Sequence, residues 1–163
     1  MLVMLLYIQT VESAWADDYG DAPASYGVPS HSIVAGIHLG TTAPDTETAA
    51  QPSATATLDD TTGTDDEDGI TLPTLPQGQT ASITATVTGA GGYLQGWIDF
   101  NGDGDFADAG EQVATNIQDN LVGDTNNTAG TIAFNVAVPA TAVTTQTYAR
   151  FRWSSTNGLD ATA

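Results

Sequence analysis

The sequence contains no cysteine and no lysine, and these two absences exclude several classes of protein. Without cysteine, the chain has neither disulfides nor thiolate chemistry. The chain has two arginines, Arg150 and Arg152, and 20 acidic residues, which gives a formal net charge of −18. A nucleic-acid-binding surface needs clustered Lys and Arg, and so does docking on anionic lipid. We therefore expect no nucleic-acid partner and no binding to an anionic membrane.

Long apolar runs are also absent. The run "MLVMLLYI" at the start of the chain is too short to span a bilayer. The small residues Ala14 and Ala16 fit a signal-peptide cleavage site, but a basic segment before the apolar run is missing. Two interpretations of residues 1–16 stay open: a signal remnant, or a retained donor strand. At 163 residues the chain has room for about one domain, which we place at 17–163.

Alternating apolar and polar residues predict strands rather than helices. In the segment 79–89, Ala81, Ile83, Ala85 and Val87 fall on one face. Further strands are predicted within 31–40, 91–100, 130–139 and 146–155. No window has a 3.6-residue apolar period bounded by caps. We therefore predict an all-β fold, a β-sandwich of Ig-like or jelly-roll-like type with long acidic calcium-binding loops.

The segment "DFNGDGDFADAGE", residues 99–111, has the spacing of a calcium loop. Its oxygen-bearing side chains belong to Asp99, Asn101, Asp103, Asp105, Asp108 and Glu111. Oxygens at positions 1, 3 and 5 with glycine at position 6 match the first half of the pattern D-x-[DN]-x-[DN]-G. The glutamate falls at position 13 instead of 12, so a loop between strands fits better than an EF-hand. Oxygen ligands without cysteine favour Ca²⁺ over zinc or copper.

The alternative is a solvated acidic turn, because Asp, Asn and Gly are ordinary turn residues. Two carboxylates about 5 Å apart in water repel by roughly 0.8 kcal/mol. Five of them form about ten pairs, so several kcal/mol are at stake against a typical stability of about 5–15 kcal/mol. Since the chain has no lysine to neutralise this repulsion, we predict a bound calcium ion.

A second acidic cluster, "LDDTTGTDDEDGI", is less regular, and a flexible acidic linker is its alternative interpretation. The metal ligands predicted here are Asp59, Asp60, Asp65, Asp66 and Asp68. We predict no catalytic residues and no enzyme, because the chain has neither a nucleophile-elbow nor a phosphate-loop motif.

Four stretches together closely resemble the GEVED domain, a family of bacterial secreted and cell-surface modules. They are "DYGDAPASYG", "DDTTGTDDEDGI", "LQGWIDFNGDGDFADAGEQV" and "YARFRWSST", and the resemblance extends over about residues 17–160. It implies a β-rich, non-catalytic extracellular module stabilised by calcium. The family's Gly-Glu-Val-Glu-Asp signature and last strand are missing after "STNGLDATA". We therefore expect that the final strand is either cut off or supplied from elsewhere.

These features predict a structural or adhesive module at the cell surface. An apolar strand from residues 1–16 of another copy would fill the open position by strand addition, and head-to-tail addition builds a filament. The expected partners are thus other copies of the chain or neighbouring surface-protein domains. The alternative is a calcium-dependent carbohydrate-binding module with a glycan as partner. That alternative requires a tryptophan with its ring face in solvent, with Trp97 and Trp153 as candidates.

Overall fold

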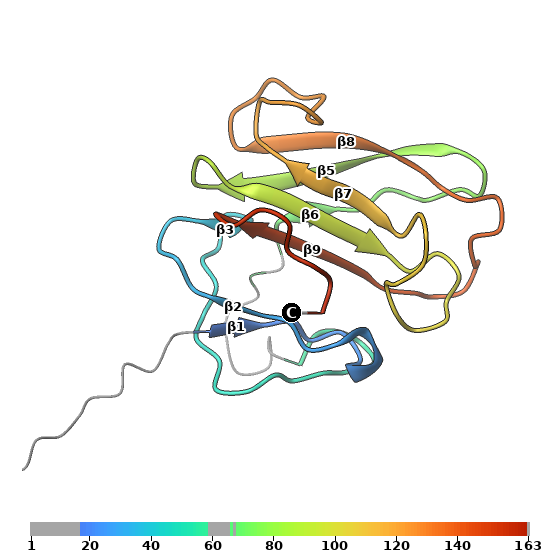
Figure 1. Cartoon of the computed structure of the whole chain (residues 1–163), viewed down its shortest axis with the longest axis horizontal. Helices are drawn as coiled ribbons and strands as arrows, with labels where there is room; N and C mark the ends of the chain where they lie inside the picture. Colours follow the sequence, from blue (N-terminus) through green and yellow to red (C-terminus); the bar gives the residue numbers. More distant parts are fainter. Residues whose placement is uncertain (1–16, 59–65, 67, 163) are drawn as a thin grey trace, which may run out of the picture.

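The computed structural model describes residues 17–58, 66 and 68–162 (Figure 1). Its strands are β1 (Asp17–Tyr19), β2 (Ser30–Ser32), β3 (His38–Leu39), β4 (Ile70–Thr71), β5 (Thr80–Thr88), β6 (Tyr93–Ile98), β7 (Gln112–Ile117), β8 (Thr131–Ala137) and β9 (Ala149–Ser154). One short 3₁₀ helix, η1 (Ala24–Tyr26), is the sole helical element in the described ranges. The expected donor segment 1–16 lies outside these ranges, as do the predicted ligands Asp59, Asp60 and Asp65.

All strand pairs are antiparallel and form three sheets. In the first sheet, β8 pairs with one edge of β5, while the short strands β3 and β4 follow each other along the opposite edge. The second sheet has the order β7–β6–β9, and the third is the β1–β2 hairpin. The hairpin lies below β9 in Figure 1, on the side of the molecule away from β8.

The first two sheets share one hydrophobic core. Ala81, Ile83, Ala85 and Val87 of β5 are all buried in it, as the alternation in the sequence predicts. Their partners from the other strands include Leu94, Ile98, Ile132, Phe134, Val136 and Trp153. The prediction of an all-β fold with alternating strands is therefore confirmed. The Ig-like or jelly-roll-like connectivity stays a prediction.

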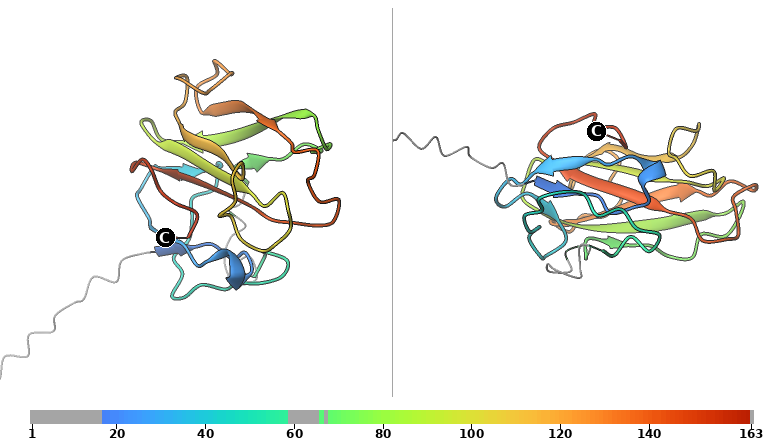
Figure 2. Two further views of the ribbon diagram at one scale, coloured as in Figure 1. Left: turned by 45° about the vertical axis from the view of Figure 1, so that its right-hand side comes forward. Right: turned by 90° about the horizontal axis from the view of Figure 1, so that it is seen from below.

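A second, smaller cluster covers the other side of the β7–β6–β9 sheet. Trp97 of β6 packs there with Tyr26 of η1, Phe106, Ala22 and Ala161. Segments from near both ends of the described chain thus lie on the outer face of this sheet, as the two views of Figure 2 show. As a result, β6 is buried on both faces, and its residues do not alternate in exposure.

The sequence-based strand predictions were incomplete, and the short strands β1 and β4 were not among them. The segment 31–40 forms two short strands instead of one, because Val34 and Ile37 close a turn whose Gly36 has φ +78°. Strand β7 was missed altogether. Its register against β6 shifts twice, and Asn116 adopts φ +52°, so it lacks the regular alternation that identifies a strand.

Candidate functional site

The predicted calcium loop, residues 99–111, connects β6 to β7. The amide of Ile98 donates to the carbonyl of Glu111 over 2.9 Å, which closes the base of the loop. Phe106 points from the loop into the small cluster beside Trp97 and packs against Tyr26 with ring centroids 4.7 Å apart. Phe106 therefore fixes the loop on the sheet, while Asp103, Asp105 and Asp108 stay exposed at the surface.

Asp99 is the central residue of this loop, with its side chain 0% exposed. Its carboxylate accepts hydrogen bonds from the Tyr26 hydroxyl at 2.6 Å and from the amides of Gly102 at 2.5 Å and Gly104 at 3.1 Å. Burial alone would raise the pKa of Asp99, but these three donors outweigh it and lower the pKa below its usual value. Asp99 is therefore a buried carboxylate held in its ionised form.

The next three oxygen-bearing side chains each cap the backbone two residues further on. Asn101 Oδ1 accepts from the amide of Asp103 at 2.9 Å, and Asp105 Oδ1 accepts from the amide of Ala107 at 2.8 Å. Asp103 Oδ1 accepts from the amide of Asp105 over a longer 3.4 Å. Such Asx turns are the local reason that Asp and Asn in this spacing produce a tight loop.

The amide nitrogen of Asn101 lies between two carboxylates. It donates to Asp103 Oδ2 at 3.0 Å and to Asp108 Oδ2 at 2.5 Å. Glu111 is buried nearby and accepts from the amides of Phe100 and Asp108. Burial raises the pKa of Glu111, and the charges of Asp99 and Asp108 add to this shift. The loop thus brings all six predicted ligand residues of this segment into one hydrogen-bonded structure.

The side chains do not form a ready-made ion cage. Within residues 17–58, 66 and 68–162, no three His, Asp or Glu side chains converge as ligands of one ion would. In the second acidic cluster, the Asp68 carboxylate accepts from the hydroxyl of Thr41 at 2.6 Å, which lowers its pKa. Asp66 accepts from the amide of Asp45 at 3.1 Å. These two aspartates fasten the loop after β3.

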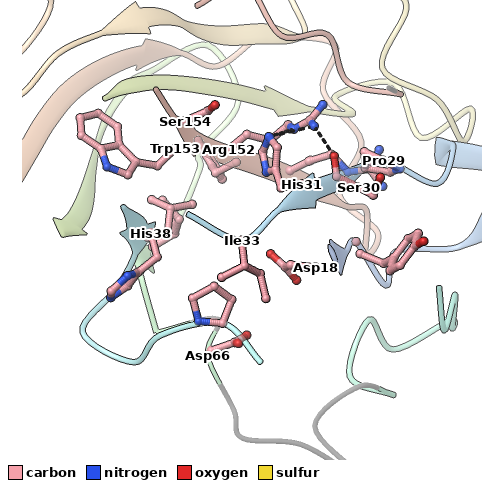
Figure 3. A pocket seen from close by; sticks show the side chains of 18 of the residues that line it. Asp18, Pro29, Ser30, His31, Ile33, His38, Asp66, Arg152, Trp153 and Ser154 are labelled. Atoms are coloured by element: carbon pink, nitrogen blue, oxygen red, sulfur yellow. Dashed lines mark hydrogen bonds between the residues drawn. The ribbon is translucent and has the colours of Figure 1, made fainter. Parts of the chain in front are cut away.

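A second feature, a cavity of about 440 Å³, was not foreseen from the sequence (Figure 3). We call it the β9 cleft, because β9 forms one wall and the β1–β2 hairpin, β3 and β4 form the others. Its apolar lining includes Ile37, Leu39, Ile70, Phe151 and Trp153. Both histidines and both arginines also line it, although these residues lie far apart in the sequence.

The two arginines attach the outer segments to β9. Arg150 donates to the carbonyls of Tyr26 and Ala161, and Arg152 donates to those of Ser30 and Asp160. Because Arg150 and Arg152 are also only 7% and 5% exposed, most of their donors are used inside the protein. The alternating arginines are thus explained by these structural contacts.

His31 is partly buried beside Arg152, and both factors affect its protonation. The Nε and Nη2 groups of Arg152 lie 3.2 and 2.9 Å from His31 Nε2, so this ring nitrogen acts as an acceptor (Figure 3). Burial, and then the charge of Arg152, lower the pKa of His31 to about 4. His31 is therefore neutral at physiological pH, with its proton on Nδ1.

Comparison with known proteins gives one match. The model of the GEVED domain matches residues 93–163, which include β6 to β9 and the whole acidic loop. No curated protein and no solved structure matches the chain. A search of the described residues found no helix long and apolar enough to cross a membrane. The resemblance noted in the sequence is thus confirmed over its C-terminal part: residues 93–163 of this chain carry a GEVED domain.

Proposed function

We propose that this protein is a non-catalytic structural or adhesive module of the cell surface, stabilised by a calcium ion at loop 99–111. The observation that carries the proposal is the loop itself. It holds five carboxylates and one side-chain amide in a single hydrogen-bonded structure, in a chain with no lysine to neutralise them. A divalent cation removes the repulsion among these carboxylates at little structural cost.

The donor set suits calcium. All side-chain ligands available in the loop are oxygens, the type that Ca²⁺ prefers, and the Asn101 amide group marks a place between Asp103 and Asp108 where positive charge is stabilised. The ligands would be Asp99, Asn101, Asp103, Asp105, Asp108 and Glu111. The exposed side chains of Asp103, Asp105 and Asp108 would exchange their present hydrogen bonds for the ion, whereas Asp99 and Glu111 are buried in place.

An extracellular location accords with this chemistry. Modules with a GEVED domain are presumed to be secreted or surface-exposed, and the acidic composition without lysine agrees with that setting. Extracellular calcium sites commonly have dissociation constants of about 0.1–1 mM. At a hundredfold excess of the ion, one such site adds about 2.7 kcal/mol to stability, which compensates in part for the absence of disulfides.

The carbohydrate-binding alternative receives no support from the two candidate tryptophans. Trp97 and Trp153 are each 5% exposed, and Trp153 Nε1 donates to the carbonyl of Thr88 at 3.0 Å. Neither ring presents a face to solvent on which a sugar could stack. We therefore retain the structural role as the proposed function.

Association of copies is a further part of the proposal. We expect the module to assemble with itself into a filament, or to associate with neighbouring surface-protein domains, through strand donation. The donor predicted from the sequence, residues 1–16, lies outside the described residues. Light scattering over a range of concentrations tests this part: growth of the particle mass is expected, and a single monomer mass at every concentration contradicts it.

The ion is tested by thermal unfolding with calcium, with magnesium and with a chelator. Calcium is expected to raise the midpoint by about 5–10 °C over the chelator, the shift that corresponds to a few kcal/mol in a domain of this size. Magnesium should do much less, because it gives up its water ligands reluctantly. The double variant Asp103→Asn, Asp105→Asn should lose most of the shift, whereas Asp17→Asn, outside the loop, should keep it. Equal unfolding midpoints with calcium, magnesium and chelator would contradict the ion site and would show that the loop is a solvated acidic turn.

A further inference from the structure

Strand β9 has one paired edge and one open edge. Because the amide of Asp99 donates to the carbonyl of Tyr148, the backbone groups of Arg150 and Arg152 point towards β6. Those of Ala149, Phe151 and Trp153 therefore point the other way. No hydrogen bond reaches these outward N–H and C=O groups from any described residue.

The outward edge of β8, in the first sheet, is partly capped by a loop. On β8, the outward amide of Ala133 donates to Asp124 Oδ1 at 2.9 Å, and the amide of Thr125 donates back to the Ala133 carbonyl at 2.7 Å. The loop before β8 thus caps part of that strand's free edge. Such capping is the usual protection of an edge strand, and β9 lacks it among the described residues.

The open edge of β9 borders the β9 cleft. Phe151 and Trp153 line it from β9, Leu39 and Ile70 line it from β3 and β4, and Leu72 lies at its rim with 48% of its surface exposed. An apolar cleft beside unpaired backbone groups is complementary to an extended chain, which offers backbone donors and acceptors along one edge and side chains on its faces. A rigid small molecule cannot satisfy three successive outward backbone positions in this way.

The charge around the cleft restricts the sequence of such a strand. Asp18, Asp21 and Asp66 line the cleft together with Arg150 and Arg152, so the acidic character around it comes mainly from the whole chain, which carries a net charge of −18. Repulsion disfavours an acidic segment, so an uncharged or basic one is selected. We propose that the β9 cleft binds an extended, apolar, non-acidic strand of another polypeptide chain, which adds to the open edge of β9.

Backbone amide hydrogen exchange of the full-length protein tests this proposal. The probe is a capped nine-residue peptide of alternating threonine and valine with one central lysine, and a control peptide carries prolines in place of the valines. At nine-tenths occupancy, the amides of Ala149, Phe151 and Trp153 should exchange about tenfold more slowly. The amides of Arg150 and Arg152 already pair with β6 and serve as internal references. A peptide with glutamate in place of lysine should bind more weakly.

Two proline variants locate the binding edge. Ala149→Pro removes an outward N–H of β9 without breaking a bond to β6, and it should abolish peptide binding. Ala137→Pro makes the same change on the outward edge of β8, and it should leave binding intact. Leu72→Ala removes an apolar contact at the rim of the cleft without changing its charge, and it should weaken binding about tenfold, which corresponds to about 1.4 kcal/mol.

Three results would overturn the proposal. The first is unchanged exchange of the three outward amides at saturating peptide, and the second is equal binding by Ala149→Pro and the wild type. The third is slow exchange of these amides in the free protein, because the chain's own segments would then fill the cleft. The proposal rests on the strand donation proposed above, for which it names the acceptor edge, and it does not depend on the calcium ion. Measuring the calcium-dependent midpoint on the same samples shows separately whether the proposed ion site is correct.

Discussion

The hydroxyl of Tyr26 donates a 2.6 Å hydrogen bond to the buried carboxylate of Asp99, across 73 positions of sequence. The bond joins η1 near the start of the described chain to the acidic loop after β6. Burial, together with this hydrogen bond, raises the pKa of Tyr26 to about 12, so the hydroxyl remains a donor throughout the physiological range. The N-terminal segment and the acidic loop therefore stabilise each other.

Replacing Tyr26 by phenylalanine should lower the free energy of unfolding by about 1.5–3 kcal/mol, the usual contribution of a hydrogen bond to a charged group. The ring contacts with Phe106 and Tyr148 would remain, so the loss would come mainly from the hydroxyl. Urea unfolding with a chelator present measures it. Tyr148→Phe is the matched control, because its hydroxyl bonds a carbonyl at an exposed site, and it should cost about 1 kcal/mol or less. A larger loss in the control would contradict the assignment.

Asp99→Asn should be the most destabilising change among the loop carboxylates when no calcium is present. An asparagine has one acceptor oxygen in place of two, and its amide nitrogen would face the Tyr26 hydroxyl and the glycine amides that donate to Asp99. We expect a loss of about 2–4 kcal/mol, since buried donors would be left unpaired. Asp108→Asn, at an exposed position, should change stability by about 0.5 kcal/mol or less. Equal effects in urea unfolding would show that the Asp99 contacts are not important.

His31 should make stability depend on pH between about 6.5 and 4. Its pKa is about 4 in the folded protein and 6.5 ordinarily, so the unfolded chain takes up the proton first as the pH falls. The contribution of His31 is thus fully present above pH 6.5 and is lost as the pH drops towards 4. Arg152 contacts the ring, and Asp18 lies opposite His31 in the backbone register of the β1–β2 hairpin.

The variant His31→Gln, which keeps an acceptor for Arg152, should show a flatter dependence of the urea midpoint on pH over this range. Parallel curves for the wild type and His31→Gln would mean that other groups, chiefly carboxylates, account for the acid sensitivity.

Gly96 should not tolerate a larger residue. A Cβ atom at this position would lie 2.4 Å from the ring of Phe151 and 3.2 Å from Ala114. Gly96→Ala should therefore destabilise the protein by about 1–3 kcal/mol, as overpacking of a core does. The second substitution Phe151→Leu should recover part of the loss in the same background. If thermal unfolding shows no coupling between the two positions, the close packing of β6 on β9 is wrong.

The sequence alone was sufficient where local patterns determine structure. The alternation in 79–89 places Ala81, Ile83, Ala85 and Val87 in the core because strand side chains point to opposite faces in turn. Likewise, the spacing of Asp and Asn in 99–111 sets up the turns of the acidic loop, because each side chain bonds an amide two residues away. Both effects act over a few residues, so they can be recognised in the sequence without knowledge of the fold.

Only the tertiary structure brings distant segments together. Nothing local to Tyr26 indicates a bond to Asp99, and nothing local to His31 indicates that burial, together with Arg152, keeps its ring neutral. The β9 cleft likewise exists because β9 ends its sheet opposite β3 and β4, which is a consequence of strand order. Local patterns determined the regularly alternating strands, such as β5 and β8, and the acidic loop of this protein. Burial and pairing between distant segments decided which charges are neutralised and which edge is left open, because these depend on contacts made only when the chain is folded.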